Sequence, residues 1–111
     1  MRFIISFDAG TMIVSDEDLP EVSEDAHRVM REAQQCGAWV TGGGLFDKPA
    51  TIVQTDGSVA QGPWPEPKAV IGGFSIVDVA SLDEAVEWAK KIAVACRCPQ
   101  EVRELMDDPE V

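Results

Sequence analysis

Two long segments of helical periodicity, each set between short apolar segments, limit the folds open to this chain. In the first, apolar residues recur at three- and four-residue steps over residues 22–36. Its start is predicted either at the capping-box-like segment Ser15–Asp18 or at Pro20, because proline is favoured in the first turn of a helix. The second covers residues 82–93 and follows a Ser-x-x-Glu capping box at 81–84. Two amphipathic helices are therefore predicted.

Short segments rich in β-branched and aromatic residues flank these helices and are predicted to form strands. Asp56-Gly57 lies between two of them and is typical of a tight hairpin turn. Gly42-Gly43-Gly44 lacks the Lys-Ser/Thr pair and the following helix of a phosphate loop, so it indicates a bulge or a close backbone approach within a strand. The order of elements predicts an α+β, ferredoxin-like split β-α-β fold, with two helices on one face of an antiparallel sheet. The strand segments are 2–7, 38–46, 50–55, 58–61, 70–79 and 101–105.

The chain is acidic, with 9 Lys and Arg against 20 Asp and Glu and a net charge of −11 over 111 residues. Such a field repels phosphates and anionic lipid headgroups, which argues against nucleic acid and membrane as partners. No apolar run approaches the roughly 20 residues of a membrane span, and the apolar residues 3–5 are too few for a signal peptide. We therefore expect one cytoplasmic domain over residues 1–111 with a single core.

The strand segment 70–79 carries large apolar residues on both faces, with Phe74 and Ile76 on one and Val77 and Val79 on the other. Two helices cover only one face of a sheet. A second copy on the other face would remove apolar surface from water at ~25 cal/mol per Å² and would give the twofold symmetry common among oligomers. We expect a homodimer with its sheets face to face; the alternative is a monomer with a larger core of its own.

The three cysteines are Cys36, Cys96 and Cys98, and an odd number without a secretory signal disfavours a disulfide framework. A structural zinc site needs four ligands and would have to combine all three with His27. His27 and Cys36 are nine residues apart on one predicted helix, which does not bring them close together on one face. We therefore expect reduced thiols, no metal and no other cofactor.

His27 is the chain's only imidazole, and imidazole changes protonation near neutral pH, which suits acid–base catalysis if the ring faces a cleft. The residue lies one position past Ala26, beside the apolar stripe of the first helix. Packing against the sheet, or simple exposure, is the competing interpretation. His27 is nevertheless the candidate catalytic residue.

The loop of residues 62–68 contains three prolines, which exclude a helix and a central strand there. Gly62, Pro63 and Trp64 are predicted to line a ligand cleft, because a tryptophan in a proline-stiffened loop suits a pocket lid or a dimer contact. Lys68 and Arg103 are candidates for binding an acidic ligand. The competing interpretation for both is pairing with neighbouring carboxylates, which contributes little stability.

Several short motifs, taken with their spacing, resemble the YCII-related family, specifically its Asp-Gly-Pro-Phe branch. They are Gly62-Pro63-Trp64, Gly72-Gly73-Phe74, Ser81-Leu82-Asp83-Glu84-Ala85, Gly42-Gly43-Gly44-Leu45 and Glu101-Val102-Arg103, so the resemblance runs nearly end to end. It implies the ferredoxin-like fold of the dimeric α/β-barrel superfamily, in which two sheets close around a space between protomers. The branch's signature Asp and Phe are Gln61 and Trp64 here, which removes any role for a carboxylate at the first of these positions.

The resemblance also implies a partner for the histidine. YCII-type relatives pair a histidine of the first helix with an aspartate that precedes a proline after the second helix. His27 lies close to the first of these positions, but Lys90-Lys91-Ile92-Ala93, where we expect the second, contains no Asp-Pro. The expected dyad is therefore incomplete.

Together these features predict a small homodimeric protein with a cleft lined by residues 61–68 that binds a small organic molecule. As an enzyme it would act without a cofactor as an isomerase, dehydrochlorinase or lyase on an acidic ring compound, with His27 as proton shuttle and Arg103 or Lys68 holding the carboxylate. The alternative is a non-catalytic interaction or regulatory module, in which the acidic surface and Trp64 bind a basic protein partner.

Overall fold

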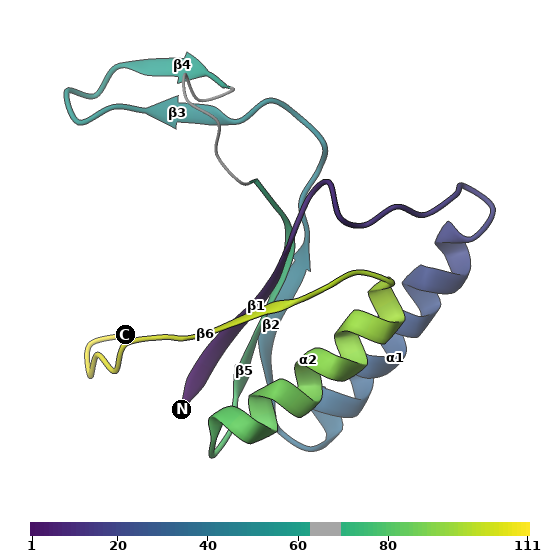
Figure 1. Cartoon of the computed structure of the whole chain (residues 1–111). Helices are drawn as coiled ribbons and strands as arrows, with labels where there is room; N and C mark the ends of the chain where they lie inside the picture. The colour runs from purple at the N-terminus through teal and green to yellow at the C-terminus, as the bar shows by residue number, and fades with distance from the viewer. Residues whose placement is uncertain (63–69) are drawn as a thin grey trace.

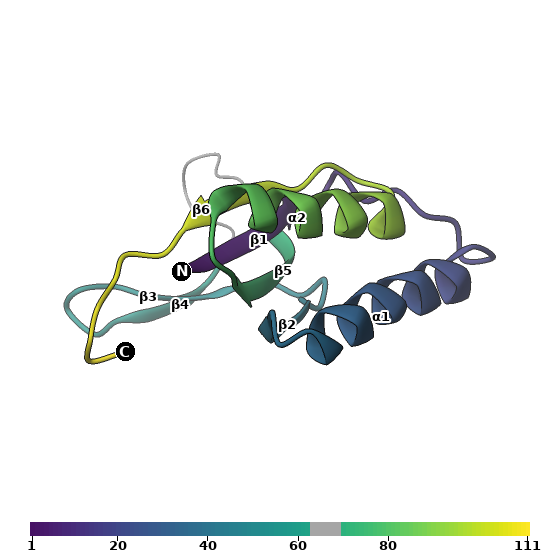
Figure 2. The same ribbon diagram turned by 90° about the horizontal axis from the view of Figure 1, so that it is seen from below.

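A computed structural model describes residues 1–62 and 70–111. Four strands form one antiparallel sheet in the order β2-β5-β1-β6, and both helices lie on the same face of it (Figures 1 and 2). This confirms the predicted ferredoxin-like α+β fold. Neither helix in the described residues is long and apolar enough to cross a membrane. The elements are β1 (Arg2–Asp8), α1 (Leu19–Gln35), β2 (Trp39–Gly44), β3 (Thr51–Val53), β4 (Val59–Gln61), β5 (Ile71–Asp78), α2 (Leu82–Cys96) and β6 (Glu101–Glu104).

Helix α1 begins at Leu19 with Pro20 in its first turn, which decides between the two predicted starts. Ahead of it, the Asp18 N–H donates to the Ser15 side-chain oxygen over 3.2 Å and to the Ser15 carbonyl over 3.1 Å. The capping-box-like sequence therefore shapes the turn that leads into the helix, and Asp18 is the N-cap residue.

Helix α2 begins at the predicted capping box. The Glu84 N–H donates to the Ser81 hydroxyl over 3.2 Å, and the Glu84 carboxylate accepts from the Ala80 N–H over 3.2 Å. These bonds satisfy backbone donors that the first turn of a helix otherwise leaves without partners. The helix ends at Cys96, so it extends beyond the predicted apolar stripe.

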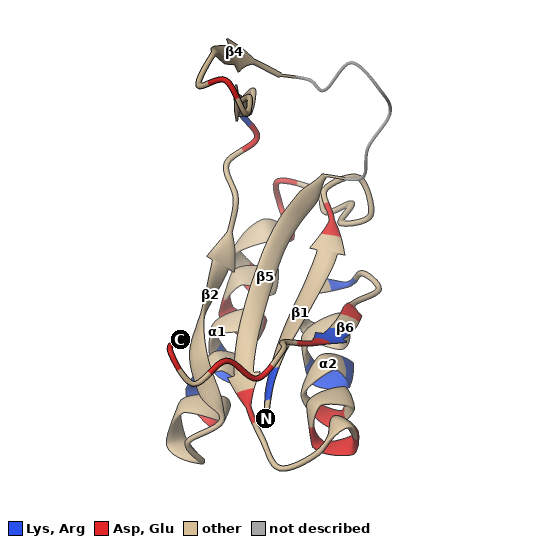
Figure 3. Cartoon of the chain, turned by 90° about the vertical axis from the view of Figure 1, so that its left-hand side faces the viewer, with Lys and Arg blue, Asp and Glu red and all other residues tan. Residues whose placement is uncertain are grey.

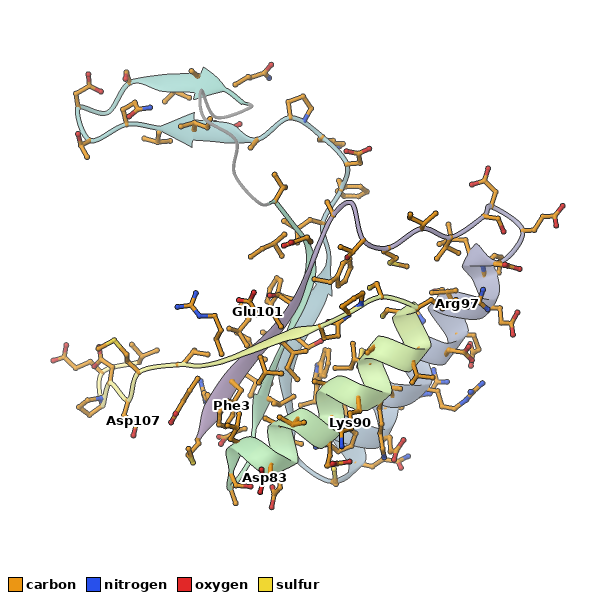
Figure 4. All side chains as sticks on the ribbon, in the orientation of Figure 1. Phe3, Asp83, Lys90, Arg97, Glu101 and Asp107 are labelled. Atoms are coloured by element: carbon orange, nitrogen blue, oxygen red, sulfur yellow. The ribbon has the colours of Figure 1, made fainter. Side chains whose placement is uncertain are left out.

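The hydrophobic core lies between the sheet and the helices. Phe3 and Ile5 of β1 and Val77 of β5 are almost completely buried there (Figure 4). Small residues of the helices pack against them, which lets the helices approach the sheet closely. These small core residues are Ala33, Ala85 and Ala89.

The glycines of β2 follow an irregularity in the strand, and at Gly42 they show the close backbone approach that was one of the two predicted reasons for them. The register between β2 and β5 shifts between Trp39 and Thr41. A methyl group at Gly42 would lie 2.5 Å from the Phe74 carbonyl oxygen and 2.9 Å from Cη2 of Trp39. Gly42 is therefore needed because the neighbouring backbone and the tryptophan ring approach it closely.

Replacing Gly42 by alanine is expected to lower the free energy of unfolding by about 1–3 kcal/mol, because the new methyl group overpacks a site bounded by backbone. Urea denaturation measures this difference. Gly43→Ala is the matched control, since a Cβ at Gly43 meets no atom within 4 Å. Equal stability of the two variants would contradict the close approach.

The hairpin of β3 and β4 forms a separate two-stranded sheet that extends away from the four-stranded sheet (Figure 1). Its turn is the predicted one: Gly57 has a φ of +85°, and the Asp56 carboxylate accepts from the Ser58 N–H over 2.8 Å. Hydrogen bonding from the Ser58 side chain, and then from this N–H, lowers the pKa of Asp56. The radius of gyration of the chain is 15.6 Å. A compact chain of this length would have about 13 Å. The hairpin therefore makes the chain more extended than a compact monomer.

Candidate functional site

A cavity of about 330 Å³ lies between the helices and the sheet, on the helix side. Helix α1 lines it with residues spaced three and four apart, which places them on one helical face. Helix α2 contributes Ile92 and Cys96, one turn apart. The volume falls in the range of about 300–1,000 Å³ typical of small-molecule sites. The lining residues are Phe7, Met12, Ser23, Ala26, His27, Met30, Trp39, Gly42, Gly43, Gly44, Phe74, Ser75, Ile92, Cys96 and Gln100.

Missing side chains in the sheet help to form this cavity. Gly44 of β2 pairs with Gly73 of β5, and Gly42 pairs with Ser75. A Cβ at Gly73 would lie 2.7 Å from the Phe7 ring, so the ring rests directly on this strand. A Cβ at Gly44 would meet no atom within 4 Å. Gly44 thus leaves room above the sheet where another residue would project a side chain, whereas the rings of Phe7 and Trp39 fill the space over Gly73 and Gly42.

His27 lies on α1 at the cavity, and its side chain is also exposed to solvent. Its Nδ1 is 3.4 Å from the hydroxyl oxygen of Ser23, one helical turn earlier. This contact occupies Nδ1 and leaves Nε2 as the ring nitrogen available to a ligand. The ring thus lies at the rim of the cavity, where it can exchange protons with solvent.

The end of α2 places two thiols in different environments. Cys96 is half-buried and lines the cavity, whereas Cys98 is almost completely buried. The Gln100 amide nitrogen donates to the sulfur and to the carbonyl oxygen of Cys98, each over 3.4 Å. Burial raises the pKa of both thiols, and the neighbouring Cys98 adds to the rise for Cys96. Both cysteines are therefore protonated at neutral pH.

Arg97 lies between these cysteines and connects the two helices. It has a left-handed backbone conformation, with a φ of 58°, at a position where glycine is the usual residue. Its guanidinium lies 3.2 Å from the Asp18 carboxylate and 3.7 Å from that of Glu21, at the start of α1 (Figure 4). These pairs are exposed and contribute little stability. They form where the C-terminal end of α2 lies next to the N-terminal end of α1.

The cavity is largely apolar. Within residues 1–62 and 70–111, the side chains that line it include no carboxylate, lysine or arginine. The same part of the chain holds no group of three His, Cys, Asp or Glu residues placed to bind a metal ion. The polar groups at the cavity come from His27, Ser23, Ser75, Cys96 and Gln100. Such a lining suits an uncharged molecule with a few hydrogen-bonding groups.

Comparison with known proteins identifies the family. The YCII-related domain matches residues 4–107. The chain belongs to the YCII-related family. A search of the curated proteins finds no match to it.

A solved structure shows that the fold of this YCII-related chain also occurs in an enzyme. It is the 5-chloro-2-hydroxyhydroquinone dehydrochlorinase TftG from Burkholderia phenoliruptrix, in complex with 2,5-dihydroxybenzoquinone. The two chains are 13% identical and superpose with a TM-score of 0.54, over 99% of this chain and 98% of the other. At this identity the likeness is one of fold.

The structure corrects the predicted position of the partner of His27 in this YCII-related chain. Lys90 to Ala93 lie inside α2, which continues to Cys96. The residue that precedes a proline after this helix is therefore Cys98, followed by Pro99. Its sulfur contacts Gln100, and His27 instead contacts Ser23. A buried thiol stands where the family resemblance implies an aspartate.

Of the site residues predicted for this YCII-related protein that the structure describes, His27 alone lines the cavity. Gly62 lies beside Ala50 at the end of the hairpin, and Arg103 pairs with Ile4 on the sheet face that carries no helix, so neither is among the lining residues. Pro63, Trp64 and Lys68 lie outside the described residues.

Sequence reasoning missed Ser23, Cys96 and Gln100 as parts of this site. The spacing of Ser23 and His27 by four was visible and is enough to place both on one helical face. Cys96 could not be assigned, because its role depends on how far α2 continues past the apolar stripe and on how the two helices sit over the glycines.

Proposed function

We propose that this YCII-related protein binds a small, uncharged ring compound in the cavity and moves a proton on it, as a lyase or isomerase that uses no cofactor. The observation that carries the proposal is the presence of the chain's only imidazole at the rim of an apolar cavity of about 330 Å³. The named activity of TftG and the ligand in its structure support an oxygenated six-membered ring as the ligand, whereas the apolar lining of the cavity supports the absence of charge. The earlier expectation of an acidic compound depended on Arg103 and Lys68, and neither carries the present proposal.

In this mechanism His27 accepts a proton from the bound ring through Nε2, while the Ser23 hydroxyl holds the imidazole through Nδ1. Phe7 and Trp39 provide aromatic surface for the ring. The Gln100 amide nitrogen is engaged by Cys98, so its carbonyl oxygen is the group free to accept a hydrogen bond from a ligand hydroxyl. In an elimination, the electron pair of the broken C–H bond forms a π bond, a leaving group such as chloride departs from the neighbouring ring carbon, and the proton passes from His27 to solvent. In an isomerisation, His27 returns the proton to another ring atom and the π bond shifts.

A cavity-filling substitution tests the location of the site. Gly44→Leu is expected to weaken binding of phenol, a simple uncharged ring, by at least about tenfold, because the new side chain occupies the ligand's space. The measurement is a titration followed by tryptophan fluorescence or by NMR. The fold accepts a side chain at this position, since a Cβ at Gly44 meets no atom within 4 Å.

Gly10→Leu is the matched control for this experiment. Gly10 lies in the turn after β1, is not among the residues that line the cavity, and a Cβ there meets no atom within 4 Å. We expect binding close to that of the parent protein, provided that sedimentation shows the same oligomeric state for both variants. Equal binding by Gly44→Leu and the parent would place the ligand elsewhere.

We also propose that the protein forms a homodimer through this helix-free face. Ile4, Phe74 and Ile76 share the face by register, and each is half-buried in the single chain. Figure 3 shows no helix over β2 and β5 on this side, where the C-terminal segment crosses in front of their lower part, and the two strands are nearly free of charged residues. The β3–β4 hairpin and the C-terminal residues 105–111 both project from the same side (Figure 1). Both segments can therefore contact a second copy that packs on this face. Such an isologous contact matches the symmetry of most soluble oligomers.

A further inference from the structure

The three cysteines differ in their exposure to solvent and to a ligand in the cavity. Cys36 is exposed at the end of α1, and Cys98 is 5% exposed with its sulfur engaged by Gln100. Cys96 is half-buried, and its exposed part faces the cavity that holds His27. A ligand that occupies the cavity therefore contacts one of the three thiols and not the other two.

A thiol next to a bound electrophilic ring can react with it by conjugate addition. It adds to a carbon–carbon double bond conjugated to a carbonyl: a sulfur–carbon bond forms and the π electrons move to the carbonyl oxygen. The thiol proton ends on that oxygen, so nothing leaves and no oxidant or reductant is needed. Quinones carry such bonds in a ring of the size that the cavity admits.

The thiolate is the form that attacks, so a base is required. Burial raises the pKa of Cys96, and therefore few thiolates are present without help. His27 lines the same cavity, and its Nε2 is not engaged by Ser23. The imidazole can take the proton from the sulfur and deliver it to the ring oxygen, which balances the addition.

We propose that Cys96 is a nucleophile of this cavity and captures quinone-type ligands covalently, with His27 as its base. The inference rests on the proposed function, because the ring must first bind in the cavity. It goes further by assigning Cys96 a covalent role and by naming conjugated ring carbonyls as the ligand class.

Para-benzoquinone is the probe, used below the protein concentration so that the adduct is not reoxidised. The full-length protein carries Cys36→Ser to remove the exposed thiol, and the adduct is located by peptide mass spectrometry. We expect a mass increase of one whole quinone on Cys96, at a rate that saturates as protein concentration is raised in excess. Phenol should slow the reaction by competition, and Gly44→Leu should slow it at least tenfold.

His27→Gln is expected to lower the maximal rate of Cys96 labelling at least tenfold and to leave the half-saturating concentration unchanged. The parallel protein with Cys96→Ser and an intact Cys36 is the control, because labelling at an exposed thiol should rise linearly with concentration and ignore phenol. Circular dichroism verifies that each variant is folded.

Labelling of Cys96 that rises linearly and responds to neither phenol nor Gly44→Leu would overturn the inference, as would adducts found on Cys98. Phenol binding by NMR separates this failure from that of the proposed function. If phenol binds in the cavity but Cys96 is not labelled, the covalent role is wrong and the binding site stands. If phenol does not bind and labelling does not saturate, both are wrong.

Discussion

Replacing His27 by glutamine is expected to lower kcat for a substrate of the cavity by about 10²–10⁴-fold, the usual contribution of a positioned acid–base group. Glutamine keeps a polar side chain of similar reach but cannot accept and return a proton at neutral pH. Substrate binding should change little, because the apolar lining of the cavity supplies most of the contact. The substrate can be sought among phenols, quinones and chlorinated hydroquinones, with chloride release and hydrogen–deuterium exchange as assays.

Two controls separate catalysis from a structural role of the histidine. Arg28→Gln changes the next residue, which pairs with Asp25 over 3.1 Å and does not line the cavity, so kcat should stay at the parent value. Added imidazole should restore part of the activity of His27→Ala, because a free base can enter the space left at the rim. A merely structural residue would give no such rescue. Full turnover by His27→Gln would exclude this residue as the proton carrier.

The local patterns of the sequence predict most of the fold. Ser81 and Glu84 form the expected capping box, Gly57 takes the expected positive φ, and Gly42 lies at the expected close approach. The capping box and the turn each depend on a few neighbouring residues, whose stereochemistry does not depend on the rest of the molecule. The approach at Gly42 is to the distant Phe74, and the glycine run indicated it only in general terms. The start of α1 was ambiguous because both Ser15 and Pro20 are compatible with a helix N-terminus, and only the turn geometry decides.

The site was harder to predict because it depends on register and on the third dimension. Arg103 faces away from the cavity because it pairs with Ile4, and a shift of one residue would have reversed its side. The cavity itself arises where Gly44 lies beside the Phe7 and Trp39 rings beneath the two helices, and these elements are far apart in the sequence. The run of three glycines at 42–44 showed that side chains are missing there. The neighbouring sequence did not show where in the fold this would leave a cavity.

Ile76→Glu is expected to raise the dissociation constant of the homodimer by more than about 100-fold. Ile76 pairs with both Ile4 and Thr41, which places it in the middle of the helix-free face. Leaving a charge buried without a partner costs about 3–5 kcal/mol. Twofold symmetry brings each such change into the interface twice, and every 1.4 kcal/mol corresponds to about tenfold in affinity. Sedimentation equilibrium over a range of protein concentrations measures the change.

Val94→Glu is the matched control, since Val94 is 81% exposed on the other side of the molecule, on α2. It introduces the same charge into the same acidic protein, so any general effect of added repulsion appears in both variants. If Val94→Glu dissociates the dimer equally, net charge and not the sheet face governs assembly. If the parent protein sediments as a single chain at micromolar concentration, the apolar residues on this face have no partner copy, and Ile4, Phe74 and Ile76 must be explained by the core of one chain alone.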